Sequence, residues 1–183
     1  MPDIYQLTGR LTAGKKWRYG KTRAVMAFNF KKEDPDLYSV IIKIWPGVID
    51  LYNDDLSFNN GRKNYLSDMN SNDKLVILCH ADERGPEGIN AIQLAILLRQ
   101  AGLNRVGVIK MHACCIGRGV WMNDFKHHLL NKGISFAYLS GPRGIYRYYY
   151  GLRFAQGGYK ILPGNLLQDF TGTRYTANNV DIY

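Results

Sequence analysis

The stretch Lys74-Leu75-Val76-Ile77-Leu78-Cys79-His80 decides the fold, because it is a continuous apolar run that ends in a histidine. A second apolar run, Val106-Gly107-Val108-Ile109-Lys110-Met111, continues into His112-Ala113-Cys114-Cys115. The segment 88–101 between the two runs carries apolar residues at helical spacing, and Gly102 follows it as a natural C-terminal stop. Strand, helix and strand at this spacing predict a right-handed parallel crossover, in which both strand C-termini reach the same edge of one sheet.

Further elements are predicted on both sides of this unit. In chain order they are a strand at 23–30, a polar turn at 31–36, a strand at 38–45 rich in β-branched residues, a loop at 50–73, a helix at 120–131 and a strand at 134–139. The alternation of strands and helices predicts a three-layer α/β/α sandwich with a mostly parallel central sheet. A length of 183 residues suits one domain. We expect residues 1–24 and 144–183 to form a basic N-terminal and a tyrosine-rich C-terminal extension packed on it.

A histidine and a cysteine at the carboxyl ends of these two strands suggest thiol chemistry. Open α/β sheets usually carry their sites at this edge. A nucleophilic cysteine needs a base that takes its proton, since the thiolate is the attacking species. His80 and Cys114 would supply these two parts, and the glycines in Ile116-Gly117-Arg118-Gly119 would permit a tight turn that aims backbone N–H groups at an oxyanion. Structural burial is the alternative role for a free cysteine.

The two strand ends resemble the motifs of the caspase-like cysteine peptidases, a group that includes caspases, gingipains, clostripain, separase and the autoprocessing domains of large bacterial toxins. In that group an apolar strand ends in a histidine, commonly His-Gly, and a second apolar strand ends in a small residue followed by the catalytic cysteine. The segment 76–81 matches the first motif, with Ala81 in place of the glycine, and 109–115 matches the second. The resemblance covers residues 74–140 and implies a caspase-like fold and a cysteine endopeptidase acting on protein or peptide substrates.

By this resemblance Cys114 is the nucleophile and His80 the general base. The backbone amides of Cys114 and of Ala81 or Gly85 are the candidates for the oxyanion hole. Cys115 is the alternative nucleophile, and Cys114 is preferred because Ala113 supplies the small residue before it. No third catalytic residue is identified. Asp82 is close in sequence, but neighbouring residues of an extended chain point in different directions, so we expect Asp82 to be solvated.

The net charge of +9 is concentrated at the two ends of the chain. Residues 1–35 carry a net +5, residues 36–116 a net −1 and residues 117–183 a net +5. A basic surface can simply aid solubility, or it can bind a polyanion. The toxin autoprocessing domains respond to inositol hexakisphosphate, so an inositol phosphate is the activator that this analogy suggests, with no other cofactor required. The residues proposed for a polyanion site are Lys15, Lys16, Arg18, Arg143, Arg147 and Lys160.

Other function classes have less support in the sequence. The spacing of cysteines and histidines does not form the paired ligands of structural zinc, so no metal site is predicted. Arginine and tyrosine alternate in the C-terminal region, but no nucleic-acid-binding motif accompanies them. A non-catalytic basic binding module on the same scaffold and a thiol-dependent transferase stay open as alternatives.

The expected compartment is a reducing cytosol. Three cysteines, two of them adjacent, do not form a disulfide framework. The N-terminus lacks the pattern of a conventional signal peptide, and no apolar run approaches the ~20 residues of a membrane-spanning helix. By analogy with the toxin domains, the protein would be a bacterial effector or toxin fragment that reaches this cytosol after delivery into a host cell.

Overall fold

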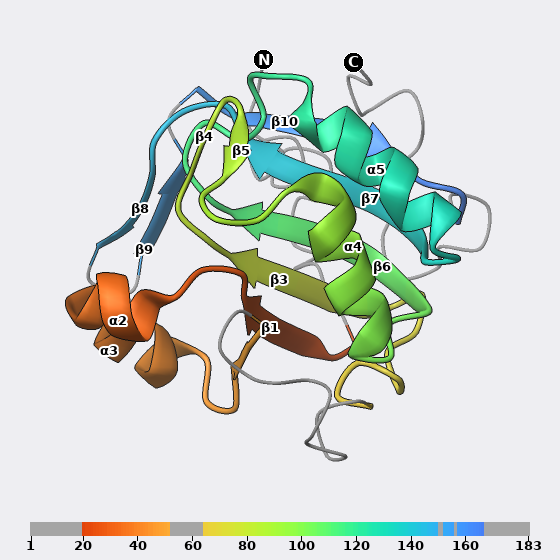
Figure 1. Cartoon of the computed structure of the whole chain (residues 1–183), viewed down its shortest axis with the longest axis horizontal. Coiled ribbons are helices and arrows are strands. Elements are labelled where there is room, and N and C mark those ends of the chain that lie inside the picture. Colours follow the sequence, from red (N-terminus) through yellow and green to blue (C-terminus); the bar gives the residue numbers. More distant parts are fainter. Residues whose placement is uncertain (1–19, 52–63, 150–151, 156, 167–183) are drawn as a thin grey trace, which may run out of the picture.

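The chain forms a six-stranded, mostly parallel sheet with helices on both faces (Figure 1). The computed structural model describes residues 20–51, 64–149, 152–155 and 157–166. The strand order is β10-β7-β6-β3-β1-β2, and only β10 runs antiparallel to its neighbour. The elements are β1 (Thr22–Met26), α2 (Phe30–Glu33), α3 (Pro35–Ile44), β2 (Ile49–Asp50), β3 (Lys74–Leu78), β4 (Ala81–Asp82), β5 (Gly85–Pro86), α4 (Ala91–Gln100), β6 (Arg105–His112), α5 (Trp121–Asn131), β7 (Ser135–Pro142), β8 (Tyr146–Tyr149), β9 (Leu152–Ala155) and β10 (Tyr159–Pro163).

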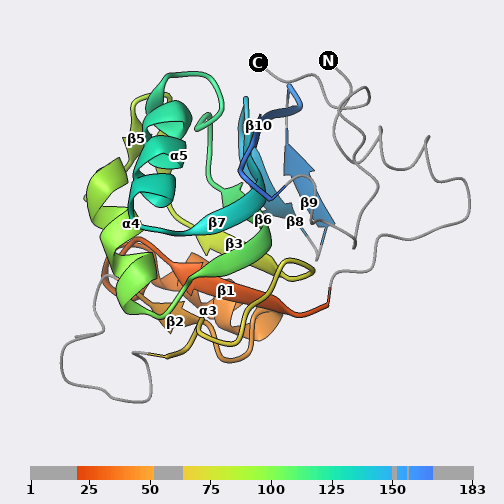
Figure 2. The same ribbon diagram turned by 90° about the vertical axis from the view of Figure 1, so that its right-hand side faces the viewer.

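The two sides of the sheet bury different sets of side chains. On one side Leu75 and Ile77 of β3 pack in the core that α4 and α5 cover. On the other side Val76 and Leu78 pack against Phe30 and Ile41, which belong to α2 and α3. Figure 2 shows α4 and α5 on one side of the sheet and the β8–β9 hairpin on the other. Because β3 is covered on both faces, its sequence is continuously apolar, as expected for a central parallel strand. The α/β class and the mostly parallel sheet are therefore confirmed, and the layers are compatible with a three-layer sandwich.

The central elements follow the prediction closely. The strands expected around residues 74–79 and 106–111 are β3 and β6, and they are adjacent and parallel. Helix α4 connects them and begins with a capping box, in which Asn90 and Gln93 each bond to the backbone of the other. Helix α5 leads from β6 to β7, which extends three residues beyond its predicted end, to Pro142.

The prediction for residues 23–45 was wrong in part. Strand β1 ends at Met26, the expected polar turn contains the short helix α2, and the expected second strand is the helix α3. Asp34 caps α3, because its Oδ1 accepts a hydrogen bond from the N–H of Leu37 at 3.1 Å. Pro35 occupies the first turn, where its missing N–H costs nothing. The β-branched residues of 38–45 favoured a strand, but the cap and the packing of the helix override that propensity.

The segment expected as a C-terminal extension contributes to the sheet itself. Strand β10 pairs antiparallel with β7 over five residues, from Tyr159 opposite Pro142 to Pro163 opposite Tyr138. Strands β8 and β9 form a separate two-stranded hairpin just before it. Most of the expected N-terminal extension, residues 1–19, and most of the expected loop, residues 52–63, lie outside the described residues.

Replacing Ile41 by alanine tests the packing of α3 against the sheet. Its side chain is 1% exposed, so Ile41→Ala should lower the free energy of unfolding by about 2–5 kcal/mol. The matched control is Ile42→Ala, whose side chain is 42% exposed and whose loss should cost less than about 0.5 kcal/mol. Urea unfolding followed by circular dichroism measures both values, and similar losses for the two variants would contradict this packing.

Candidate active site

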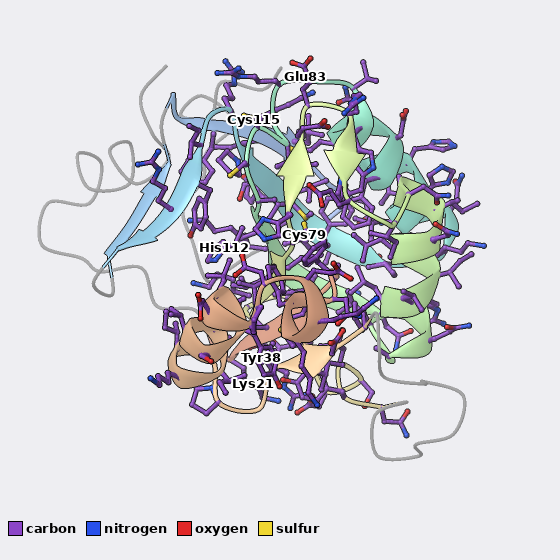
Figure 3. All side chains as sticks on the ribbon, turned by 60° about the vertical axis from the view of Figure 1, so that its left-hand side comes forward. Lys21, Tyr38, Cys79, Glu83, His112 and Cys115 are labelled. Atoms are coloured by element: carbon purple, nitrogen blue, oxygen red, sulfur yellow. The ribbon has the colours of Figure 1, made fainter. Side chains whose placement is uncertain are left out.

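The register of β3 and β6 brings the two predicted residues to the same part of the sheet edge. Leu78 is the partner of His112, and the N–H of Cys79 continues the ladder with a bond of 3.4 Å to the His112 carbonyl. His80 and Cys114 each follow two residues after this pair, just beyond the ends of the two strands. Figure 3 shows the neighbouring Cys79, His112 and Cys115 at this edge, with Glu83 of the β4–β5 hairpin above them.

His80 and Cys114 also share one face of the sheet. His80 packs against Phe28 and Phe30 on the side that α2 and α3 cover, with ring centroids 4.8 and 5.2 Å away. Cys114 packs on the cluster formed by Val108, Tyr138 and Tyr146, on the same side of the sheet. Cys79 points to the opposite side and lies in the core under α4 and α5. Cys79 is therefore a packing residue that faces away from His80.

The carboxylate of Asp34 lies beside the histidine, and the sequence analysis missed it. Its Oδ2 is 3.1 Å from Nε2 of His80, while its Oδ1 caps helix α3. The two side chains are 34% and 36% exposed, so the contact is partly shielded from water. The sequence does not single out Asp34, because the region around it is predicted as a turn followed by a strand. The sequence signal that could have found it is the Asp-Pro start of a helix.

Asp82, the carboxylate closest in sequence to His80, is engaged elsewhere. It forms a salt bridge of 2.6 Å with Arg84 within the same hairpin, and the Arg84 hydrogen bonds lower the pKa of the Asp82 carboxyl. This agrees with the expectation that Asp82 does not serve the histidine.

The Cys114 thiol contacts the backbone of Tyr146. The N–H of Tyr146 donates to Sγ at 3.4 Å, and the thiol donates to the Tyr146 carbonyl at 3.6 Å. Among the described residues, His80 and Cys114 form no hydrogen bond with each other.

The turn after Cys114 depends on close backbone approaches. Cys115 has a positive φ of 55°, the single described residue other than glycine in that region of backbone conformation. Its N–H donates to the Gly144 carbonyl at 2.8 Å. A Cβ on Gly119 would lie 2.0 Å from the Glu83 carbonyl oxygen, so glycine is required for the turn to pack on the β4–β5 hairpin. The turn and the hairpin after His80 are thus held together.

The two candidate oxyanion donors occupy the β4–β5 hairpin. Ala81 pairs with Pro86 across it. Gly85 has a φ of +136° and lies against the Trp121 ring.

The residues proposed for a polyanion site divide into three groups. Lys15, Lys16 and Arg18 lie outside the described residues. Lys160 is only 9% exposed, and its ammonium donates to the Gly119 carbonyl at 2.9 Å. Burial and the nearby Arg143 lower the pKa of Lys160. Arg147 is exposed and Arg143 half-buried. Lys160 therefore supports the turn after Cys114 instead of forming part of an open surface.

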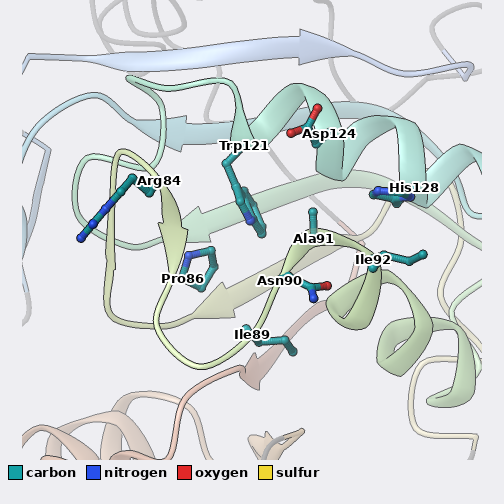
Figure 4. A pocket seen from close by; sticks show the side chains of 9 residues that line it. All are labelled: Arg84, Pro86, Ile89, Asn90, Ala91, Ile92, Trp121, Asp124 and His128. Atoms are coloured by element: carbon teal, nitrogen blue, oxygen red, sulfur yellow. The ribbon is translucent and has the colours of Figure 1, made fainter.

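A pocket of about 550 Å³ lies between the β4–β5 hairpin and the helices α4 and α5 (Figure 4). Pro86, Ile89, Ala91 and Trp121 form its apolar wall, and Arg84, Asn90, Asp124 and His128 are its polar lining residues. It lies beside the start of α4 and along α5, on the side of the sheet that these two helices cover. His80 and Cys114 lie on the opposite side.

The described part of the chain contains no group of three or more His, Cys, Asp or Glu side chains placed to hold a metal ion. Of the helices in these same ranges, none combines the length and the apolar character needed to cross a bilayer. Comparisons of the chain with protein-family models, with curated proteins and with solved structures found no match.

The three thiols should differ in reactivity. Burial raises the pKa of the Cys79 thiol far above its ordinary value, whereas Cys114 and Cys115 are partly exposed. Iodoacetamide at neutral pH should therefore modify Cys114 and Cys115 in the folded protein and leave Cys79 intact, because the thiolate is the reactive form. Mass spectrometry of the digested protein measures this, with urea-unfolded protein as the control in which all three react. Rapid modification of Cys79 in the folded protein would contradict its assignment to the core.

Proposed function

We propose that the protein is a cysteine endopeptidase of caspase-like fold, with Cys114 as nucleophile and His80 as general base. The observation that carries the proposal is the position of these two residues, each two residues beyond the last pair of the adjacent parallel strands β3 and β6 and both on one face of the sheet. Asp34 adds to it, because a carboxylate beside the histidine is the usual means of orienting a catalytic imidazole.

The contact with Asp34 determines which nitrogen of His80 acts as the base. A carboxylate accepts a hydrogen bond, so the Nε2 that faces Asp34 carries the proton and Nδ1 has the free lone pair. In the reaction Nδ1 takes the Cys114 proton, and the thiolate attacks the scissile carbonyl carbon. His80 then passes the proton to the departing amine as the peptide C–N bond breaks. Water hydrolyses the resulting thioester and restores the thiol.

Support for the nucleophile comes from the different surroundings of the two adjacent cysteines. The Cys114 side chain lies on the face of the sheet that carries His80. Cys115 follows in the turn, with its backbone bonded to Gly144. An inositol phosphate or another polyanion remains the activator that we propose, with Arg143 and Arg147 as its described candidate ligands.

A thiol-dependent transferase would use the same dyad on another acceptor, and a binding module would not use it at all. Incubation with a peptide library, followed by identification of the products, separates these functions. New carboxyl termini indicate hydrolysis, a transferred acyl group indicates a transferase, and unchanged peptides indicate binding alone.

Cys114→Ala should abolish peptide hydrolysis, since no other group supplies the nucleophile. His80→Ala should lower kcat/KM by at least about a hundredfold, the size typical of a lost general base. Cys115→Ala is the matched control and should retain much of the activity. Loss of activity in Cys115→Ala alone, with Cys114→Ala active, would move the nucleophile by one residue and overturn the assignment.

Asp34→Ser separates the role of Asp34 at His80 from its role in α3. Serine caps a helix nearly as well as aspartate, but its side chain is too short to reach the imidazole. We expect the free energy of unfolding to change by less than about 0.5 kcal/mol while kcat falls by about tenfold or more and KM stays similar. Asp34→Ala, which loses the cap as well, should cost about 1 kcal/mol of stability. Unchanged kcat in Asp34→Ser would exclude a positioning role.

A further inference from the structure

The Cys114 sulfur has a hydrogen-bond donor other than the histidine. The N–H of Tyr146 points at Sγ with an N–S distance of 3.4 Å. The thiol in turn reaches the Tyr146 carbonyl at 3.6 Å. Both contacts come from the backbone of one residue, which lies 32 positions after Cys114 and begins β8.

A network of backbone contacts holds Tyr146 in this place. The carbonyls of Pro142 and Gly144 accept hydrogen bonds of 2.8 Å from Gly117 and Cys115, in the turn that follows the nucleophile. The Arg143 carbonyl accepts a hydrogen bond from the guanidinium of Arg118. Three residues of the segment just before Tyr146 are thus bonded to the turn just after Cys114.

The Tyr146 side chain adds a fourth support. It is 8% exposed, and its ring lies against the ring of His112, with centroids 4.7 Å apart and planes tilted by 33°. His112 belongs to β6 and lies two residues before Cys114, so the strand that carries the nucleophile also carries the support for Tyr146. The His112 ring is 6.3 Å from that of Trp45, at the end of α3.

We propose that the Tyr146 N–H donates a hydrogen bond to the Cys114 thiolate and is a further catalytic group, and that His112 is the residue that positions it. When His80 takes the thiol proton, the contact from the thiol to the Tyr146 carbonyl is lost. The bond from the Tyr146 N–H remains, and it strengthens because its acceptor now carries a negative charge. A hydrogen bond to a charged acceptor stabilises that acceptor, so the N–H supports the sulfur in the form that attacks. This inference refines the proposed function, on which its catalytic part rests.

The test replaces the N–H of Tyr146 by an ester oxygen in the full-length chain, through suppression of a stop codon with the α-hydroxy analogue of tyrosine. The side chain and the Tyr146 carbonyl stay in place. The chain also carries Cys115→Ser, so that alkylation reports on Cys114 alone. Tyrosine reinserted by the same method is the matched control. At neutral pH, iodoacetamide should alkylate Cys114 about tenfold more slowly in the ester variant, the size expected for one hydrogen bond to a charged group.

His112 is tested in the same assay with two variants. His112→Phe retains a ring beside Tyr146 and should keep the alkylation rate near that of the parent. His112→Ala removes the ring and should slow the reaction in the same direction as the ester. If Cys114 is alkylated at the same rate in both variants, His112 does not position Tyr146. Circular dichroism identifies any variant that fails to fold.

The outcomes distinguish this inference from the proposed function. An unchanged or faster alkylation in the folded ester variant overturns the role of the N–H, and the faster rate would mean that the contact with Tyr146 restrains the thiol. Slower alkylation in a protein that hydrolyses no peptide supports the role of the N–H in stabilising the thiolate and counts against the peptidase. If the protein hydrolyses peptides and the ester variant is alkylated at the control rate, the peptidase proposal is supported and the Tyr146 N–H has no part in the mechanism.

Discussion

The candidate site depends on the parallel register between β3 and β6. Leu78 is the partner of His112, and His80 and Cys114 each follow two residues later, where the two strands have just ended. Side chains alternate along an extended chain, so a shift of one residue would turn either His80 or Cys114 to the opposite side of the sheet. Because β3 is buried on both faces, its own apolar pattern does not set this register.

The two faces of the sheet give Cys79 and His80 different surroundings. Cys79 faces the core under α4 and α5, where burial keeps its thiol protonated. His80 faces α2, with Phe28 and Phe30 around its ring and Asp34 at its Nε2. The adjacent residues Cys79 and His80 therefore lie in different environments, although both follow the same strand. The connection β1-α2-α3-β2 covers this second face, and it supplies the carboxylate that the strand ends lack.

The central part of the fold could be predicted from the sequence because its signals are local. Continuous apolar strands and the amphipathic helix between them are readable from residues 74–112 alone. The region 30–45 could not be read in this way, because its β-branched residues favour a strand while Asp34, Pro35 and the packing of Ile41 make it a helix. The same error concealed Asp34, whose contact with His80 joins residues 46 positions apart. The contact of Tyr146 with Cys114 could not be predicted for a related reason. It is made by a backbone N–H, which every residue except proline has, so the residue type does not reveal it.

The turn after Cys114 explains why backbone contacts matter so much at this edge. Its residues are held by main-chain carbonyls of the segment 142–144 and by the close approach of Gly119 to Glu83. Lys160 donates its buried ammonium to the Gly119 carbonyl and so ties β10 to the same turn. These contacts need glycine or a particular backbone conformation, as the positive φ of Cys115 shows. The turn after Cys114 is thus supported by three segments distant in the sequence, which are the hairpin after His80, the residues before β8 and strand β10. A site built this way is sensitive to changes that leave His80 and Cys114 themselves untouched, because movement of any one segment displaces the turn that carries the sulfur.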